Sequence, residues 1–343
     1  MEFEFGGSLQ ETLNNLIGPT RTSRLFRILV VDPALTEDSG SRVSRAKIAQ
    51  ALNMLLFEDL IERVPAAKVY VEHCLAHGRK VMHDHGAVRT IAMTGMGNLP
   101  AGEESITRIL RPLGYSLNGV YPLERLRMTG RSYAHADAPD EIAQFFVSEL
   151  HPGRFSPAFQ DAVSRVLAGS QDPLSPKAQF LLHELARDGR IGFADAAAML
   201  PELKACFARQ HAVPHLADYE ILLAESAEMA WIATEGNMFN HVTDRVDDLL
   251  RVTEEQKALQ RPMKQTIEVS GSGRIKQTAF KADMVLRQFV GVDGELIEMM
   301  VPGSFYEFIS RDHYLDAVAD VTKLDLGFDA ANAQGIFKMT ATA

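Results

Sequence analysis

Apolar residues near the start of the chain recur at a helical spacing. Within residues 41–63 they lie three or four positions apart, at Ile48, Leu52, Leu55, Leu56, Leu60 and Ile61. That period places them on one face of a helix. We therefore expect residues 1–79 to form an N-terminal helical part.

The pattern changes to short β-like runs after residue 80. Residues 88–93 read as a strand, and the glycine-containing stretch 95–100 interrupts it. A short amphipathic helix is predicted over residues 103–113, with further β-like runs in 115–129. Residues 80–137 therefore read as a strand, a helix and further strands.

A second helical stretch is predicted over residues 138–234. Ser156 and Ser175 each precede a proline, which is the arrangement of an N-cap followed by the first helical residue. Gly189 suits a helix end, and residues 216–232 have the apolar period of one long helix. We interpret this stretch as an inserted helical layer.

The β pattern returns in residues 235–343. Five β-like runs are predicted, over residues 239–246, 266–270, 278–289, 295–301 and 305–310, and a helix over 246–259 follows the first run. Glycines at 271, 273 and 294 suit hairpin turns. The order strand, helix, strands thus occurs twice, which predicts an α+β fold in one large domain, residues 1–343, with added helical layers.

Composition narrows the function classes. The 343 residues carry a net charge of −10, which disfavours broad nucleic-acid binding because that needs a basic surface. No apolar run approaches the ~20 residues of a membrane helix, and the acidic start does not resemble a secretory signal. Cys74 and Cys206 lie in apolar helical stretches and are expected to be buried thiols. We expect a cytoplasmic enzyme with no nucleic-acid or membrane partner.

Three predicted strands each carry a residue able to bind a metal, with an arginine four positions later. The pairs are His85 and Arg89, His241 and Arg245, and Glu307 and Arg311. Positions i and i+4 of a strand lie on the same face, so each strand offers a ligand and a cation to one cavity. Two histidines and one carboxylate form the facial triad typical of non-haem Fe(II) oxygenases, which leaves positions open for substrate and O2.

Each candidate also has a structural interpretation. His83 competes with His85, since both would face the same side of a regular strand; the following Gly86 favours His85. His241 could be a hydrogen-bonded edge residue. Glu307 lies between two aromatic residues and is costly to bury alone, so it either binds a metal or pairs with Arg311.

The same segments resemble the 2-oxoadipate dioxygenase/decarboxylase family, also known as D-2-hydroxyglutarate synthases, within the glyoxalase-like vicinal-oxygen-chelate superfamily. The resemblance lies in His85-Gly-Ala-Val-Arg89, in Glu235-Gly-Asn-Met-Phe-Asn-His241-Val-Thr-Asp-Arg245, in Phe305-Tyr-Glu307-Phe-Ile-Ser-Arg311, and in the tail from Phe328 to Phe337. It extends from about residue 40 to the end of the chain. It implies a curved, mostly antiparallel sheet built from two strand-helix-strand halves.

The resemblance also implies site residues and a reaction. The family's metal ligands map onto His85, His241 and Glu307, and its substrate-carboxylate arginine maps onto Arg89, with Arg245 and Arg311 as further candidates. The implied cofactor is Fe(II), and the implied reaction is O2-dependent decarboxylation and hydroxylation of a 2-oxo acid, with 2-oxoadipate and 2-hydroxyglutarate as the favoured substrate and product.

Two other functions stay open from the sequence. A glyoxalase-like isomerase or lyase would use the metal as a Lewis acid without O2. A non-catalytic protein would keep only an anion pocket. The sequence is compatible with a homo-oligomer and does not define the oligomeric state.

Overall fold

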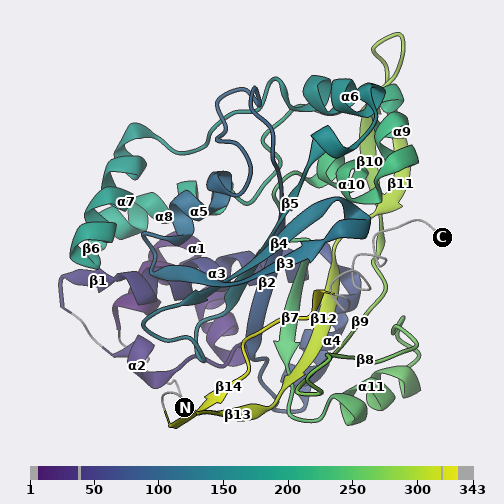
Figure 1. The fold of residues 1–343 in the computed structure, drawn as a ribbon. Coiled ribbons are helices and arrows are strands. Elements are labelled where there is room, and N and C mark those ends of the chain that lie inside the picture. Colours follow the sequence, from purple (N-terminus) through teal and green to yellow (C-terminus); the bar gives the residue numbers. More distant parts are fainter. Residues whose placement is uncertain (1–6, 38–39, 318–319, 331–343) are drawn as a thin grey trace.

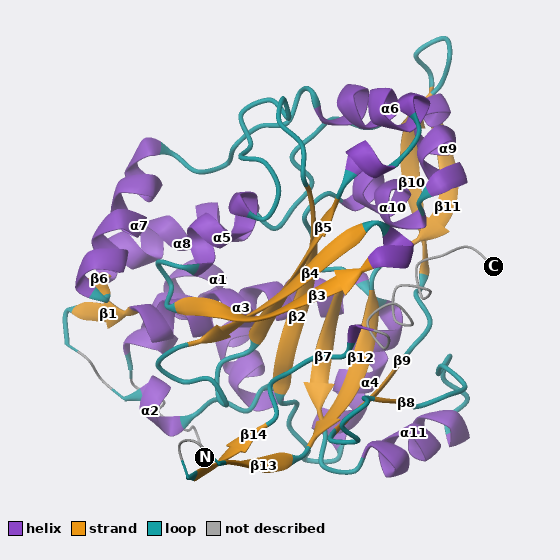
Figure 2. Ribbon diagram, viewed as in Figure 1, coloured by secondary structure: helices purple, strands orange, loops and turns teal. Residues whose placement is uncertain are grey.

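The computed structural model describes residues 7–37, 40–317 and 320–330. An eight-stranded sheet forms its centre, in the order β3-β4-β5-β2-β7-β12-β9-β8, and helices surround it (Figures 1 and 2). None of the described helices is long and apolar enough to cross a membrane. Residues 331–337 of the family-like tail lie outside the described part of the chain.

The sheet consists of two halves with the same strand order. The first half contains β2 (His83–Ile91), α5 (Glu104–Leu110), β3 (Tyr115–Leu123), β4 (Met128–His135) and β5 (Gln144–Leu150). The second contains β7 (His241–Arg245), α11 (Leu249–Ala258), β8 (Glu268–Val269), β9 (Ile275–Ala279) and β12 (Phe305–Arg311). From the centre outward, the orders are β2-β5-β4-β3 and β7-β12-β9-β8.

Strand directions follow the same symmetry. β2 and β7 pair antiparallel at the centre, while β2 with β5 and β7 with β12 are the parallel pairs. The remaining pairs within the sheet are antiparallel. The predicted α+β fold, with a mostly antiparallel sheet from two strand-helix-strand halves, is confirmed.

N-terminal helices cover one face of the sheet. They are α1 (Ser8–Ile28), α3 (Arg45–Arg63) and α4 (Pro65–Ala76), and α8 (Phe193–Ala205) packs beside α1 and α3. Side chains of β2, β7 and β12 that point to these helices, such as Val88, Val242 and Phe308, join the main apolar core. We call this the helix face, and the opposite face, which carries His85, the site face.

The other elements lie around this framework. They are α2 (Pro33–Thr36), α6 (Pro157–Leu167), α7 (Pro176–Asp188), α9 (Leu216–Glu225), α10 (Ala227–Glu235), β1 (Arg42–Ser44), β6 (Arg190–Gly192), β10 (Met284–Val290), β11 (Leu296–Pro302), β13 (His313–Asp316), β14 (Val321–Leu324) and the 3-10 turns Glu124–Leu126 and Pro152–Arg154. Ser156 and Ser175 cap α6 and α7 as predicted, and Gly189 ends α7 at φ 67°.

Three element predictions were wrong. The run predicted over residues 278–289 is two strands, since β9 ends at Ala279 in the main sheet and β10 begins at Met284 in a separate two-stranded sheet with β11. The stretch from residue 138 is not helical at its start, because β5 (Gln144–Leu150) completes the first half of the sheet. The predicted long helix over residues 216–232 is broken at Ser226, whose extended backbone (φ −151°, ψ 110°) separates α9 from α10. The division of the chain into four parts stays a prediction, with the strand content of residues 138–234 corrected.

Candidate metal centre

His85, His241 and Glu307 come together on the site face from three neighbouring strands. Thr243 of β7 is the Cα partner of both His85 on β2 and Glu307 on β12. His85 Nε2 lies 3.3 Å from Glu307 Oε2, and His241 Nε2 lies 3.2 Å from the same oxygen. All three residues are buried. Among the described residues they form the one group of three or more His, Cys, Asp or Glu side chains arranged to hold a metal ion.

The residue before each histidine fixes the orientation of the imidazole. Asp84 Oδ1 lies 2.8 Å from His85 Nδ1, and Asn240 Oδ1 lies 3.2 Å from His241 Nδ1. Each Nδ1–H therefore donates to that acceptor, and each Nε2 faces Glu307 Oε2. Such partners set the tautomer and ring orientation of metal-binding histidines.

Electrostatic interactions keep Glu307 ionised. Burial raises the pKa of this carboxyl, but His241 and His85 outweigh burial and hold the pKa well below its usual range. Burial lowers the pKa of His241, which favours the neutral imidazole that binds metals. Burial also acts to lower the pKa of His85, but Asp84 and Glu307 together raise it.

The spacing of Glu307 from the two histidines fits a divalent cation. Ligands about 2.1 Å from an octahedral ion lie about 3 Å apart when they are adjacent. The separations of 3.3 and 3.2 Å from Glu307 to the two histidines are close to that value. Two imidazoles and one carboxylate suit non-haem Fe(II) and leave three octahedral positions open.

Arg311 supports the site from behind His85. Its Nε and Nη2 donate to Asp84, both with contacts of 2.9 Å, and its Nη1 donates to the carbonyl oxygens of Asp325 and Gly327. The guanidinium thus holds the carboxylate that orients His85. The alternative in which Arg311 pairs with Glu307 is not what the structure shows, since these contacts engage all three guanidinium nitrogens.

Arg245 lies at the edge of the site. Its Nη2 donates to the carbonyl oxygen of Asp140 at 2.6 Å, and its Nη1 lies 4.0 Å from Asp84 Oδ2. Its role in substrate binding stays a prediction.

Arg89 is four residues beyond His85 on the same face of β2. Its side chain is buried, and its guanidinium carbon lies 4.9 Å from the centre of the Trp231 ring. Burial lowers the pKa of Arg89 to about 10, with Glu228 acting in the opposite direction. Arg89 also acts to lower the pKa of His241, which places its positive charge near the triad. It stays charged at neutral pH inside an apolar wall, a setting suited to an anionic ligand.

His83 does not share a face with His85, so that prediction was wrong. A β-bulge lies between these residues, where β2 pairs with β7. Because the bulge inserts one residue, His83 turns to the helix face and packs against Phe57 and Phe239. Burial lowers its pKa to about 3, as expected for a neutral core histidine.

The described end of the chain packs against His85. The Phe328 ring lies 4.8 Å from the His85 ring and 5.0 Å from the Phe146 ring, and its backbone N–H donates to Tyr121. Phe328 therefore shields one side of the His85 ring.

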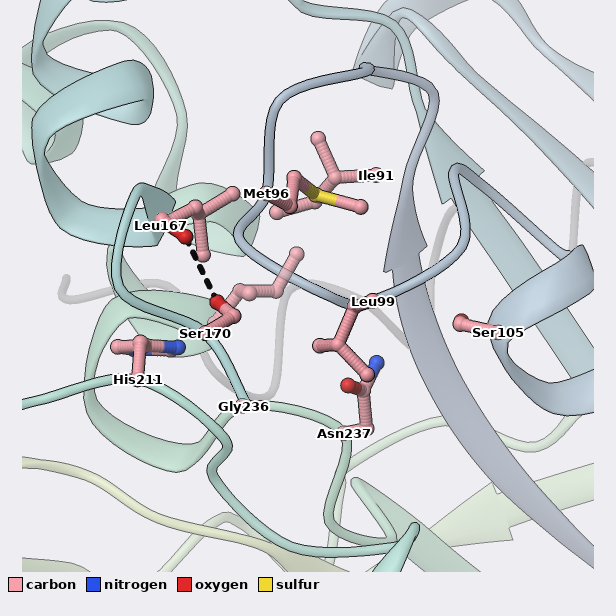
Figure 3. Close-up of a pocket in the computed structure, with 10 residues that line it drawn as sticks. Ile91, Met96, Leu99, Ser105, Leu167, Ser170, His211, Gly236 and Asn237 are labelled. Atoms are coloured by element: carbon pink, nitrogen blue, oxygen red, sulfur yellow. Dashed lines mark hydrogen bonds between the residues drawn. The ribbon is translucent and has the colours of Figure 1, made fainter. Parts of the chain in front are cut away.

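Two cavities lie away from the triad. One, of about 20 Å³, has a wall that includes Ile91, His211 and Asn237 (Figure 3). It has room for little more than one water. A larger cavity of about 250 Å³ lies at the far end of β7, lined by residues that include Tyr70, Arg79 and Asp244. Neither is lined by a triad residue, so the triad itself remains the candidate site.

Sequence reasoning missed the supporting residues Asp84, Asn240 and Thr243. The Thr243 hydroxyl donates to Glu307 Oε2 at 2.7 Å and lies 3.1 Å from His85 Nε2. Asp84 and Asn240 could have been found from the sequence, because each carries an acceptor oxygen and directly precedes one of the two histidines.

Comparisons with known proteins identify the family of the chain. The family model described as 2-oxoadipate dioxygenase/decarboxylase matches residues 49–320. A protein from Ralstonia eutropha JMP134, described as belonging to the glyoxalase superfamily, is 58% identical over 94% of this chain and 98% of its own, with a TM-score of 0.89. No curated protein matches the chain.

Two more distant structures share the fold. Hydroxyglutarate synthase from Oryza sativa, in complex with 2-oxoadipate, is 20% identical over 87% of this chain and 93% of its own, with a TM-score of 0.66. The Pseudomonas putida enzyme, also with 2-oxoadipate, is 20% identical over 88% of this chain and 74% of its own, with a TM-score of 0.63. On the family match, this chain belongs to the 2-oxoadipate dioxygenase/decarboxylase family.

Proposed function

We propose that this protein catalyses the Fe(II)- and O2-dependent decarboxylation and hydroxylation of a 2-oxo acid, with 2-oxoadipate as the favoured substrate. The observation that carries the proposal is the buried triad of His85, His241 and Glu307, in which both histidine Nε2 atoms lie 3.2–3.3 Å from one Glu307 oxygen. Family membership supports the reaction class, and the two hydroxyglutarate synthases of the same fold were each solved with 2-oxoadipate.

The proposed reaction balances without a second organic substrate. One 2-oxoadipate and one O2 give one 2-hydroxyglutarate and one CO2. The bond between C1 and C2 breaks, one oxygen atom enters the carboxylate formed at C2, and the other enters the hydroxyl group on the neighbouring carbon. The 2-oxo acid supplies all the electrons that O2 accepts.

The residues of the chain have separate roles in this proposal. His85, His241 and Glu307 would hold the iron, which when bound supplies a Lewis acid for the 2-oxo acid and a redox centre for O2. Asp84 accepts a hydrogen bond from the Nδ1–H of His85, and Arg311 donates a hydrogen bond to Asp84. Thr243 donates to Glu307 and fixes the rotamer of that carboxylate. Asn240 Oδ1 faces His241 Nδ1 in the same way, so each of the three proposed ligands has a partner that sets its orientation.

Arg89 would bind the remote carboxylate of the substrate. Its guanidinium can form two parallel hydrogen bonds to a carboxylate, and the surrounding apolar wall strengthens that pairing. Phe328 shields one side of the His85 ring. The substrate would then extend across the site face from the triad to Arg89.

An oxygen-electrode screen tests the proposal. The protein is purified without oxygen, loaded with Fe(II) and given 2-oxo diacids and monoacids of several lengths. We expect O2 uptake with 2-oxoadipate and its absence in the His241→Ala variant. Conversion of a 2-oxo acid without O2 uptake would favour the alternative of a metal-dependent isomerase or lyase.

A further inference from the structure

Gln144 is a buried polar residue beside the triad that the mechanism above does not use. It is the first residue of β5 and is the Cα partner of His85 on β2. Residues paired across neighbouring strands project from the same face of a sheet, about 4.8 Å apart along the hydrogen-bonding direction. The carboxamide of Gln144 therefore lies on the site face, next to His85.

The neighbours of Gln144 along β5 confirm this orientation. Phe145 packs against Phe207 and Phe239 on the helix face. Phe146 packs against Phe328, the same ring that covers His85. Because side chains alternate along a strand, Gln144 and Phe146 share the site face.

The carboxamide lacks a partner in the described part of the chain. Gln144 is 1% exposed, and neither its Oε1 nor its Nε2 has a hydrogen-bond partner among the described residues. A buried polar group without a partner is destabilising, and most such groups in proteins are satisfied. The backbone before it is held in place, since Tyr115 donates to the carbonyl oxygen of Ala143. A ligand on the site face would satisfy this amide.

The position of Gln144 indicates which end of the ligand it reaches. The triad occupies β2, β7 and β12, and Gln144 flanks it from β5 at the level of His85. Arg89, in contrast, pairs with Ser148, four residues further along β5. Gln144 is thus beside the metal-bound end of the substrate, and Arg89 is toward the remote end.

We infer that Gln144 is a substrate-binding residue whose Nε2 donates a hydrogen bond to the 2-oxo acid group at the metal. This inference rests on the proposed function. A carboxylate and a ketone offer only acceptors, so the amide would bind them through Nε2, while Oε1 remains available to a water molecule. A neutral donor suits this place because it adds no charge beside His85 and Glu307.

Binding measured without turnover tests this assignment. Wild type, Gln144→Met and Gln144→Glu are loaded with Fe(II) and titrated with 2-oxoadipate in the absence of O2, and affinity is read by calorimetry and by the substrate-induced shift in Tm. Both variants lose the Nε2 donor, so we expect affinity to fall about 10- to 100-fold, the usual effect of losing a hydrogen bond to a charged group. Gln144→Met should unfold at the same or a higher temperature than wild type without substrate, because methionine leaves no buried amide.

Control measurements separate binding from structure. Gln256 is equally buried but lies on α11 and accepts a hydrogen bond from Arg261, so Gln256→Met should lower Tm and leave substrate affinity unchanged. Iron content should match wild type in every variant. Wild-type affinity in Gln144→Met, or loss of its iron, would overturn the assignment of Gln144 alone. A wild type that binds no 2-oxo acid would overturn the proposed function and this inference with it.

Discussion

Replacement of Arg89 by methionine should make the protein more stable and less selective at the same time. Methionine has a similar length and shape but lacks the charge. In the protein without substrate, the Arg89 guanidinium is buried against Trp231, and burial lowers its pKa from the ordinary arginine value to about 10. The charged guanidinium of Arg89 is therefore less stable in the native state than in the unfolded chain, which lowers the free energy of unfolding.

The size of this penalty follows from the change in pKa. A decrease of about 2.5 corresponds to about 3 kcal/mol in favour of the uncharged form. Since the native pKa lies below the unfolded one, the penalty is present in full below about pH 10 and disappears only as the pH rises through the ordinary arginine pKa. The cation–π contact with Trp231 stabilises the charged side chain by about 1–2 kcal/mol, which offsets part of this penalty. We expect Arg89→Met to raise the free energy of unfolding by about 1–2 kcal/mol at pH 7.

The same substitution should remove recognition of the remote carboxylate. Loss of one partner from a buried charged pair typically costs about 2–4 kcal/mol, which is a decrease of about 30- to 1000-fold in kcat/KM. The effect should be confined to 2-oxo diacids, and a 2-oxo monoacid of equal chain length should be used nearly as well as by wild type. Iron content should not change, because arginine is not a ligand.

Urea unfolding without substrate and steady-state kinetics with the two acids measure both effects. Arg311→Met is the matched control: Arg311 is also buried and forms an ion pair with Asp84, so its loss leaves a buried carboxylate without its cation and should cost about 3–5 kcal/mol. A less stable Arg89→Met variant that keeps its preference for diacids would refute the reasoning. Arg245 would then be the next candidate for the remote carboxylate.

Three further predictions test other parts of the structure. His241→Ala should lose bound iron while keeping its fold, and His83→Ala, on the helix face, should keep its iron; elemental analysis distinguishes the two. Gly86→Ala should lower the free energy of unfolding by about 1–3 kcal/mol in chemical denaturation, because a Cβ atom there would lie 2.2 Å from the Phe239 ring. Burial raises the pKa of Asp244 to about 7, so this group stabilises the fold when protonated, and that contribution declines as the pH rises from about 4 to 7. The free energy of unfolding of Asp244→Asn should not decline over this pH range. At about pH 7 it should exceed that of wild type by about 3–4 kcal/mol.

The sequence predicted the architecture where the local pattern was distinctive. The order of strand, helix and strands on both sides of the inserted helices predicted two halves, and their identical strand order confirms it. β5 was missed because Gln144–Leu150 is buried on both faces, so its residues do not alternate between apolar and polar as an exposed strand does. The break at Ser226 was missed because the apolar period continues through it.

The triad could be predicted, but its surroundings could not. The spacing of each ligand from its arginine and the resemblance to the family identified His85, His241 and Glu307 as candidates. The bulge before His85 depends on pairing with β7, more than 150 residues away, and no local pattern indicates it. The partner of Arg311 is Asp84, 227 positions earlier in the chain, so only the folded sheet shows that this arginine supports a ligand.

Isotopic labelling tests the central claim most directly. Iron-loaded protein is given 2-oxoadipate under ¹⁸O2, and the O2 consumed, the CO2 released and the 2-hydroxyglutarate formed are measured together. The proposed reaction predicts equal amounts of all three, with both oxygen atoms of O2 in the product, one in the hydroxyl group and one in the new carboxylate. Formation of a product from 2-oxoadipate in the absence of O2, or a product without the label, would contradict the account.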